Sequence, residues 1–378
     1  MDVPKSLSYN GSPVKTAFIK QQFDIFGPWS GAKWSDTSPL ALFDVWPSKA
    51  VYWELTCMLQ ADWYIIAQSN GSDYTMDAVE RHPERVACMR KYVKNLTAVE
   101  DIPLDDYDLV ITFDAILNPS RDRAAVFAYY AEENWDRLYR RSLRRPAKGY
   151  DLFLAHMMDG PAALKSLPQA VSFPYLHDPS VARSVFPVQK DDSVWIDWRT
   201  VQALAGLGRG DTWNDEAESQ ASRLPDTLGL PVRYRGKQFG QTYGFADPPN
   251  WGDAAEYLKQ LARCRYYVGV GRIGGAGQGL AEAASLGCLC IGQPDKEYHR
   301  LLCHPECLCR DLEEMPRRLK VLAESKSLQA DVLAWQDAAL DKHFFRGPLN
   351  LLHEAIRMKS AGPVSARQRI ANWIWGGP

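Results

Sequence analysis

Three glycines within residues 265–295 are spaced as in a loop that binds phosphate. Gly269, Gly271 and Gly274 form the pattern G-x-G-x-x-G between an apolar run and a stretch with a helical pattern. Such a loop directs backbone N–H groups and the positive end of the helix dipole at an anion. Asp295 follows the next apolar run, where an acidic residue binds the ribose in dinucleotide folds. The segment therefore predicts a nucleotide site that is compatible with NAD(P).

Neighbouring residues strengthen the prediction of an anion site. Gly274, Gly275 and Gly277 allow close backbone approaches that a Cβ atom would block. Residues 277–285 are expected to form a helix whose first N–H groups face the ligand. Arg272 supplies a positive charge for a charge-assisted hydrogen bond to phosphate. The competing interpretation is a tight strand–helix connection that uses glycine only for packing.

The place of the motif in the chain argues against NAD(P). A dinucleotide-binding fold usually opens with its glycine motif, and several strand–helix units follow. Here about 80 residues follow Asp295, and most of them have a helical pattern. We therefore favour another phosphate-bearing ligand, with an NAD(P)-dependent oxidoreductase that binds ribose through Asp295 as the alternative.

Short apolar runs alternate with polar stretches along the chain, as in α/β proteins with parallel sheets. In the first half, the predicted strands are 16–19, 63–67, 109–113, 152–155 and 171–173, and the segments 76–93 and 124–144 have a helical character. In the second half, the predicted strands are 194–196, 232–234, 266–269 and 289–291, the predicted helices are 253–264 and 277–286, and the chain is mostly helical after Asp311.

A stretch with prolines and charges at 177–193 separates the two series. We expect two Rossmann-like domains, at 1–185 and 186–345, facing each other across a cleft, with helices at 346–378 packing back on the first domain. Ligands of such sheets bind beyond the carboxyl ends of the strands, so the cleft is the expected active site.

Composition excludes several classes of protein. Lys and Arg total 44 against 46 Asp and Glu, a net charge of −2, which gives no overall electrostatic basis for nucleic-acid binding. The sequence has no apolar run of about 18 residues and no signal-like start, so a cytoplasmic protein is expected. Cys303, His304, Cys307 and Cys309 form the only cysteine cluster. A second pair of zinc ligands does not follow it, so we expect a thiol-rich segment and no metal site.

The stretch GGAGQGLAEAASLGCLCIG resembles the donor-site segment of GT-B glycosyltransferases, especially those that build bacterial lipopolysaccharide or capsule, including Kdo transferases. The resemblance implies that the glycine loop and helix start, with Gln278 and Gly279, hold a nucleotide diphosphate. It also implies that Glu282 binds the ribose. Many retaining members carry another glutamate eight positions earlier, where this chain has Gly274. Retaining and inverting chemistry therefore both stay open.

The resemblance extends more loosely over the second half of the chain. It implies that Arg199, just past a predicted strand, lies near the donor phosphates, and that Arg235 and Lys237 are similar candidates. A solvated surface charge is the competing interpretation of each. The implied reaction is attack of an acceptor hydroxyl on the anomeric carbon, with N–H donors and positive groups stabilising the departing phosphate. The implied enzyme needs no metal and no cofactor beyond its nucleotide-sugar donor.

An inverting enzyme would take its general base from the first domain. His156 and Asp114 follow predicted strands directly, and Asp24 lies in a glycine- and Trp-rich loop after the first strand. These three are the catalytic candidates, although most such residues are caps or turn residues. The expected acceptor is a saccharide or glycolipid. The segment 365–378, with Arg and Trp residues, could rest on an anionic membrane, or its last helix could pack on the first domain.

Two further alternatives come from outside transferase chemistry. A nucleotide-sugar epimerase or hydrolase could use the same two-domain scaffold. A non-catalytic GT-B module that binds glycans or partner proteins is also consistent with the missing second glutamate.

Overall fold

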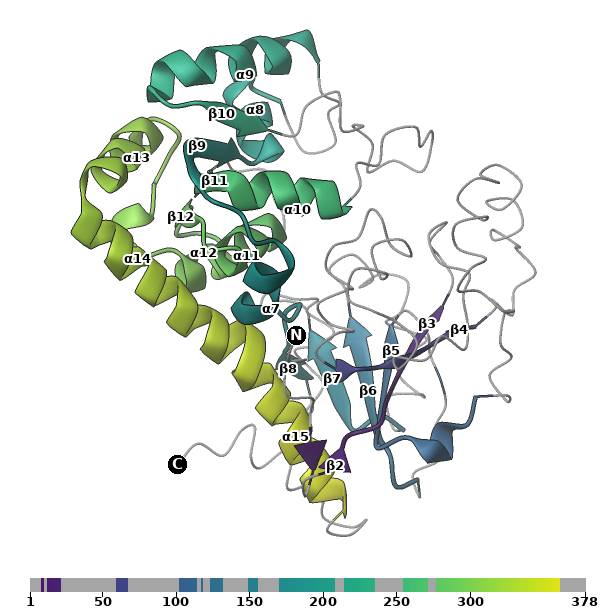
Figure 1. The fold of residues 1–378 in the computed structure, drawn as a ribbon. Helices are drawn as coiled ribbons and strands as arrows, with labels where there is room; N and C mark the ends of the chain where they lie inside the picture. Colours follow the sequence, from purple (N-terminus) through teal and green to yellow (C-terminus); the bar gives the residue numbers. More distant parts are fainter. Residues whose placement is uncertain are drawn as a thin grey trace. The chain divides into compact units, whose positions relative to one another are not determined.

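The computed structural model describes residues 8–9, 12–21, 59–66, 102–113, 117, 123–131, 149–155, 170–207, 214–234, 254–270 and 277–360 (Figure 1). The chain divides into two compact units. Unit 1 comprises residues 1–46, 52–176 and 347–378, and unit 2 comprises residues 47–51 and 177–346. Each unit is built around its own parallel sheet. This confirms the expected α/β class with two sheets.

The sheet of unit 1 has six strands in the order β4-β3-β5-β6-β7-β8, and every neighbouring pair is parallel. Its strands are β3 (Thr16–Gln21), β4 (Asp62–Ile66), β5 (Leu109–Phe113), β6 (Val126–Ala131), β7 (Leu152–Ala155) and β8 (Ala170–Ser172). A short antiparallel pair, β1 (Ser8–Tyr9) and β2 (Ser12–Pro13), and a 3-10 turn, η3 (Leu104–Asp106), also belong to unit 1. The strand order reverses between β3 and β5, which makes their carboxyl ends the expected crevice of this sheet.

Continuous apolar runs became strands because parallel strands are covered on both faces. All five runs predicted as strands in the first half contain or overlap one of β3, β4, β5, β7 and β8. The prediction of helical character for 124–144 is wrong at its start, because residues 126–131 form β6. The side chains of 126–130 are all buried, and their aromatic and β-branched content suits a central strand. The segment 76–93 lies outside the described residues.

A buried ion pair joins the last described helix to the sheet of unit 1. Lys359 Nζ donates to Asp151 Oδ2 at 2.6 Å and to the Ala125 carbonyl at 2.5 Å. The same Asp151 oxygen accepts from the Phe127 N–H at 2.9 Å. The side chains of Lys359 and Asp151 are only 11% and 6% exposed. Charge and hydrogen-bond donors therefore compensate a carboxylate that could not otherwise be buried.

The sheet of unit 2 has four parallel strands in the order β10-β9-β11-β12, with an isolated parallel bridge from Gly292 to Leu308 beyond β12. The strands are β9 (Asp191–Ile196), β10 (Val232–Tyr234), β11 (Cys264–Val268) and β12 (Leu289–Ile291). The helices are α7 (Pro179–Val185), α8 (Trp198–Leu204), α9 (Asp215–Leu228), α10 (Ala254–Arg263), α11 (Gln278–Ser285), α12 (Glu297–Leu302), η6 (Pro305–Cys307), α13 (Glu314–Glu324), α14 (Lys326–Ala339) and the π-helical η7 (Leu340–Phe345). These elements confirm the predicted strands and helices of the second half.

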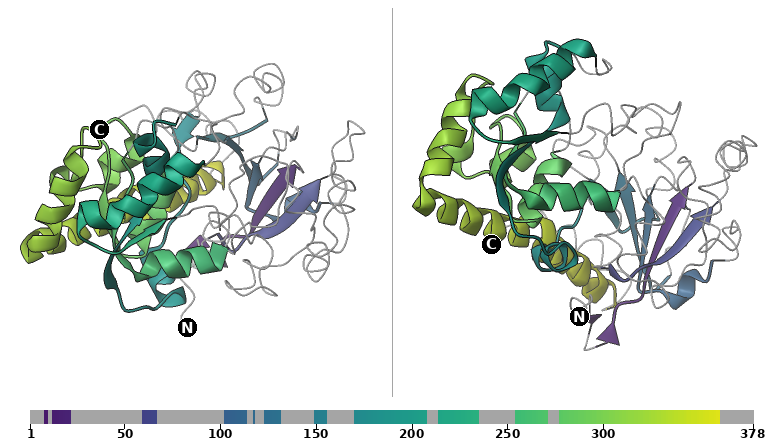
Figure 2. Two further views of the ribbon diagram at one scale, coloured as in Figure 1. Left: turned by 90° about the horizontal axis from the view of Figure 1, so that it is seen from above. Right: turned by 45° about the horizontal axis from the view of Figure 1, so that its top comes forward.

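Helices cover both faces of the sheet in unit 2 (Figures 1 and 2). Alternate strand residues such as Val194, Ile196 and Val268 form one core with α9 and α13. The intervening residues Trp195 and Tyr267 face α10 and α11, where Trp195 packs edge-on against Tyr257 with ring centroids 5.4 Å apart. Successive side chains of a strand point to opposite faces of the sheet, so each strand residue packs against the helices on one face.

The chain is helical from residue 326 to residue 360, through α14, η7 and α15 (Arg346–Ser360) (Figure 1). Among the described residues, no helix is both long enough and apolar enough to cross a membrane.

Candidate functional site

The candidate site of unit 2 lies where its strand order reverses, between β9 and β11. Strands on either side of such a point connect in opposite directions, which leaves a crevice at their carboxyl ends. Asp197 directly follows β9, and its N–H donates to the Val268 carbonyl at 2.8 Å. The Val270 N–H donates to Thr200 Oγ1 at 2.9 Å. These two bonds fix the ends of both strands beside each other.

A tyrosine–aspartate pair lies at this point. Tyr267 is 2% exposed, and its hydroxyl donates to Asp197 Oδ2 at 2.8 Å. Burial, and then the nearby Asp197 carboxylate, raise the pKa of Tyr267 well above its usual value. The tyrosine therefore stays a phenol and a hydrogen-bond donor throughout the physiological pH range.

Helix α11 starts over this pair because two of its first residues lack side chains. Gly277 is the N-cap, with φ 76°, and a Cβ there would lie 2.7 Å from Cβ of Tyr298. A Cβ on Gly279 would lie 2.9 Å from the Tyr267 hydroxyl and 3.5 Å from Asp197 Oδ2. No side chain in the described part of the chain caps this helix start. Its first N–H groups are therefore not satisfied by an N-cap side chain.

The carboxylate of Glu282 lies one turn further along α11. Glu282 is 7% exposed, and its two oxygens accept from the Tyr257 hydroxyl at 2.9 Å and from Gln278 Nε2 at 3.3 Å. Both carboxylate oxygens of Glu282 therefore take part in hydrogen bonds that orient the group. Asp197, Tyr257, Tyr267 and Glu282 are hereafter the switch-point cluster.

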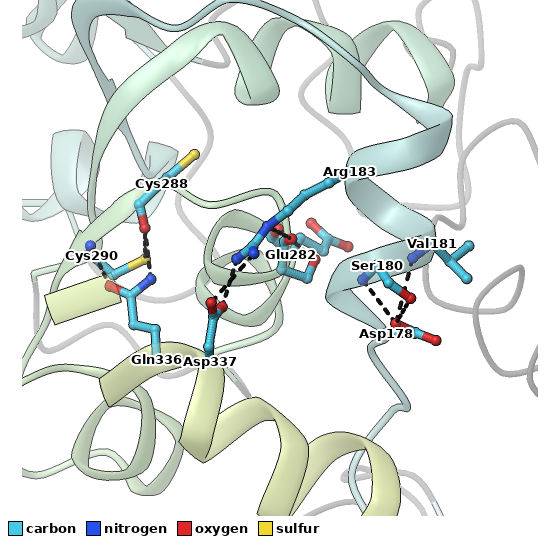
Figure 3. Close-up of polar contacts among 10 residues, drawn as sticks. Asp178, Ser180, Val181, Arg183, Glu282, Cys288, Cys290, Gln336 and Asp337 are labelled. Carbon is cyan, nitrogen blue, oxygen red and sulfur yellow. Dashed lines mark hydrogen bonds and ion pairs between the residues drawn. The ribbon is translucent and has the colours of Figure 1, made fainter. Parts of the chain in front are cut away.

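Contacts at its other end hold α11 in place. Arg183 Nε donates to the Ser285 carbonyl at 3.1 Å, and its terminal nitrogens bind Asp337 on α14, the shorter distance being 2.6 Å (Figure 3). A guanidinium at a helix carboxyl end also interacts favourably with the helix dipole. Asp178 Oδ1 caps α7 through the N–H groups of Ser180 and Val181, which fixes the helix that carries Arg183 (Figure 3).

A side chain of α14 satisfies the backbone of β12 next to α11. Gln336 Oε1 accepts from the Cys290 N–H at 3.0 Å, and Nε2 donates to the Cys288 carbonyl at 2.7 Å (Figure 3). The amide thus pairs with the strand backbone as a neighbouring strand would. Because both ends of α11 and the adjacent strand are fixed, the switch-point cluster is held by a rigid frame.

The structure places four of the predicted donor residues, Gly277, Gln278, Gly279 and Glu282, at this site. Arg199 lies in α8, but its side chain is outside the described residues, as are all of Asp24, Asp114, His156, Arg235, Lys237, Arg272, Gly274 and Gly275. Asp295, the residue of the NAD(P) alternative, lies exposed in a turn after β12.

Sequence reasoning missed Asp197, Tyr257 and Tyr267. Asp197 carried a usable signal, because it directly follows a predicted strand, as the candidates of the first half do. The two tyrosines carried none, since their contacts depend on which strand face they occupy.

The cysteine segment forms no metal centre in the described part of the chain, where no group of three or more His, Cys, Asp or Glu side chains could hold an ion. Cys303, Cys307 and Cys309 are free and buried. Burial raises the pKa of Cys307 and of Cys309 to about 12, so these thiols stay protonated.

Comparison with known proteins gives structural resemblances only. No protein-family model matches the chain, and no curated protein sequence matches it significantly. HepE of Anabaena, in complex with UDP and glucose, is 12% identical with a TM-score of 0.43, over 96% of this chain and 100% of that chain. A glycosyltransferase from Rickettsia africae is 11% identical with a TM-score of 0.43, over 93% of this chain and 99% of that chain. The pneumococcal O-GlcNAc transferase GtfA, in complex with UDP and GlcNAc, is 14% identical with a TM-score of 0.38, over 66% and 56% of the two chains. Similarities this low do not establish a family for the chain.

Proposed function

We propose that the chain is a GT-B glycosyltransferase that transfers a sugar from a nucleotide-activated donor to a saccharide or lipid-linked saccharide during synthesis of a bacterial surface polysaccharide. The observation that supports this best is the carboxylate of Glu282, held by Tyr257 and Gln278 one turn inside an uncapped helix start. A diphosphate at that helix start and a ribose on Glu282 would be a few ångströms apart, as they are in a nucleotide.

The donor would bind by two separate interactions. The first N–H groups of α11 would donate to the diphosphate, whose charge also suits the positive end of the helix dipole. The Glu282 carboxylate would accept hydrogen bonds from the ribose hydroxyls. Arg199, Arg272, Arg235 and Lys237 remain the proposed sources of positive charge near the phosphates.

In the transfer step, an acceptor hydroxyl oxygen bonds to the anomeric carbon, and the bond from that carbon to the phosphate oxygen breaks. The proton of the hydroxyl passes to a base, and the nucleoside diphosphate leaves with the electron pair. Asp24 and Asp114 follow β3 and β5 in the sequence, the two strands at which the order of unit 1 reverses. They are therefore our first choices as base, ahead of His156, which follows β7.

We also propose that transfer needs no metal and no cofactor beyond the donor, since N–H groups and basic side chains can stabilise the departing diphosphate. Turnover should then persist in excess EDTA. If turnover were lost in EDTA and restored by Mg²⁺ or Mn²⁺, metal independence would be contradicted, but the transferase activity would not. A lipid-linked acceptor is tested by measuring vesicle binding of the full chain and of a variant without residues 365–378. If the segment rests on the membrane where that acceptor lies, the variant should lose vesicle binding.

The test of the donor site is a titration calorimetry panel of UDP, GDP, dTDP, CMP, NAD(H) and NADP(H). We expect a nucleoside phosphate to bind and Glu282→Ala to weaken it about 10- to 100-fold, the value of one or two hydrogen bonds to a charged group. Tyr257→Phe should weaken it less, because the Glu282 carboxylate remains and loses only the hydrogen bond from Tyr257. Glu324→Ala, at an exposed position of α13, is the matched control and should change nothing.

Release of the nucleoside diphosphate with a glycan acceptor separates a transferase from an epimerase or a binding module. Binding of NAD(H) or NADP(H) alone would overturn the proposed function and support the oxidoreductase alternative.

A further inference from the structure

A histidine is buried between three glycines beside the switch-point cluster. His299, on α12, is 3% exposed. A Cβ on Gly292 would lie 2.6 Å from its Nδ1, one on Gly277 would lie 3.3 Å from its Cδ2, and one on Gly269 would lie 3.5 Å from its Cε1. The ring therefore occupies space that side chains at these glycines would need.

The tautomer of this imidazole follows from its hydrogen bonding. Nδ1 accepts from the Gln293 N–H at 3.0 Å. Burial, and then the charge of Lys296, lower the pKa of His299 to about 3, so the ring is neutral at physiological pH. A neutral imidazole that accepts at Nδ1 carries its proton at Nε2. His299 is thus a fixed, uncharged hydrogen-bond donor.

The direction of that donor follows from the ring geometry. Nε2 lies between Cε1 and Cδ2, the two ring atoms nearest to Gly269 and Gly277. Those glycines stand after β11 and at the start of α11. No residue in the described part of the chain forms a hydrogen bond with Nε2. The N–H of this buried side chain therefore points toward the same uncapped helix start, where it can donate to a ligand.

We propose that Nε2–H of His299 donates to a phosphate oxygen of the donor diphosphate, alongside the first N–H groups of α11, and that Gly269, Gly277 and Gly292 are small to seat this ring. This inference rests on the proposed function. A neutral donor is suited to this position because it binds an anion without requiring a charge of its own to be buried.

Two isosteric substitutions separate the donor from the packing of the ring. His299→Asn keeps an acceptor where Nδ1 lies and loses the distal donor. His299→Gln places its amide N–H₂ where Nε2 lies and loses the acceptor for Gln293. The probes are UDP, GDP and dTDP, each compared with its nucleoside. We expect His299→Asn to weaken diphosphate binding about 10- to 100-fold, the nucleoside to bind unchanged, and His299→Gln to stay within about threefold of the unsubstituted protein.

Four results distinguish the ways in which this could be wrong. If the unsubstituted protein binds neither the three diphosphates nor CMP, the proposed function fails and the inference falls with it. If it binds CMP but none of the diphosphates, only the inference fails. If it binds one of them and His299→Asn binds equally well, only the inference fails. Equal losses in both variants would mean that the ring acts by packing, which also overturns the inference.

A measurement on the unsubstituted protein covers the case in which the variants do not fold. Among the ¹⁵N-labelled histidines, His299 should be the Nε2–H tautomer and should stay neutral at pH 5. Its Nε2–H proton should move downfield on addition of the diphosphate that binds, as expected for a stronger hydrogen bond to a charged acceptor. An unchanged proton shift at saturation would overturn the inference.

Discussion

Replacement of Gly279 by alanine tests the geometry of the site, because two physical effects predict opposite signs. Alanine is the better helix former, by at most about 1 kcal/mol. However, its Cβ would lie 2.9 Å from the Tyr267 hydroxyl, which is closer than ordinary contact. That hydroxyl is buried and bonded to Asp197 at 2.8 Å, so it cannot retreat freely. Overpacking costs about 1–3 kcal/mol, and weakening a hydrogen bond to a charged group adds to this cost.

We therefore expect Gly279→Ala to destabilise unit 2 by about 1–2 kcal/mol after the gain in helix propensity is subtracted. The same substitution in a Tyr267→Phe background should be neutral or stabilising by up to about 1 kcal/mol. Without the hydroxyl oxygen, the nearest polar atom is Asp197 Oδ2 at 3.5 Å, an ordinary contact. The coupling energy between the two positions should accordingly be about 2 kcal/mol.

The assay is native-state hydrogen exchange of the α11 amides, measured by mass spectrometry on the two single variants, the double variant and the unsubstituted protein. This readout reports the local free energy of opening and does not require the two units to unfold together. If Gly279→Ala had the same effect in both backgrounds, or stabilised the unsubstituted protein, the close approach of α11 to Tyr267 would be refuted.

Three other predictions concern ionisable groups. Lys359→Met should destabilise unit 1 by about 3–5 kcal/mol in urea unfolding, because it removes the Lys359 ammonium from the buried Asp151 carboxylate. Adding Asp151→Asn should recover much of this loss, and equal stability of the two variants would refute the prediction. The contribution of His299 should lower the free energy of unfolding by about 2 kcal/mol between pH 7.5 and pH 5. The imidazole of the unfolded chain is protonated below about pH 6.5, whereas the folded imidazole, with a pKa of about 3, stays neutral. His299→Asn should remove that part of the slope in urea titrations at the two pH values, and an unchanged slope would contradict it. The six described cysteines are buried, and those of the 303–309 segment have raised thiol pKa values. They should react with Ellman's reagent only on unfolding, and fast reaction at one of these six positions in the native protein at pH 8, located by mass spectrometry, would contradict their burial.

The strands were predictable from the sequence where continuous apolar runs were short and clearly bounded. β6 was missed because its apolar residues lead directly into a polar stretch with helical spacing. A short buried strand cannot be distinguished from a helical segment by periodicity alone. The packing of the strand between β5 and β7 resolves this ambiguity, and that packing is not local in sequence.

The candidate site was predictable only in the part that is contiguous in sequence. The glycines could be found by their spacing, and Glu282 by the resemblance of its segment to the donor site of GT-B glycosyltransferases. Tyr267 bonds to a residue 70 positions away, and Tyr257 to one 25 positions away. Such contacts depend on strand register and on the face that each residue occupies. His299 could not be identified from the sequence for a related reason, because its ring packs against three glycines that come from different elements.

The pairing of Lys359 with Asp151 also has a consequence for the order of events during synthesis. The two residues are 208 positions apart, and almost all of unit 2, residues 177–346, lies between them. At roughly 5–20 residues per second, a ribosome needs about 10–40 s to make that interval. Throughout this time the Asp151 carboxylate lacks the Lys359 ammonium, and by its end nearly all of unit 2 has been synthesised. The nascent protein should therefore complete its second unit before it closes its first, and should be most vulnerable to proteases and most dependent on chaperones in the strands around Asp151.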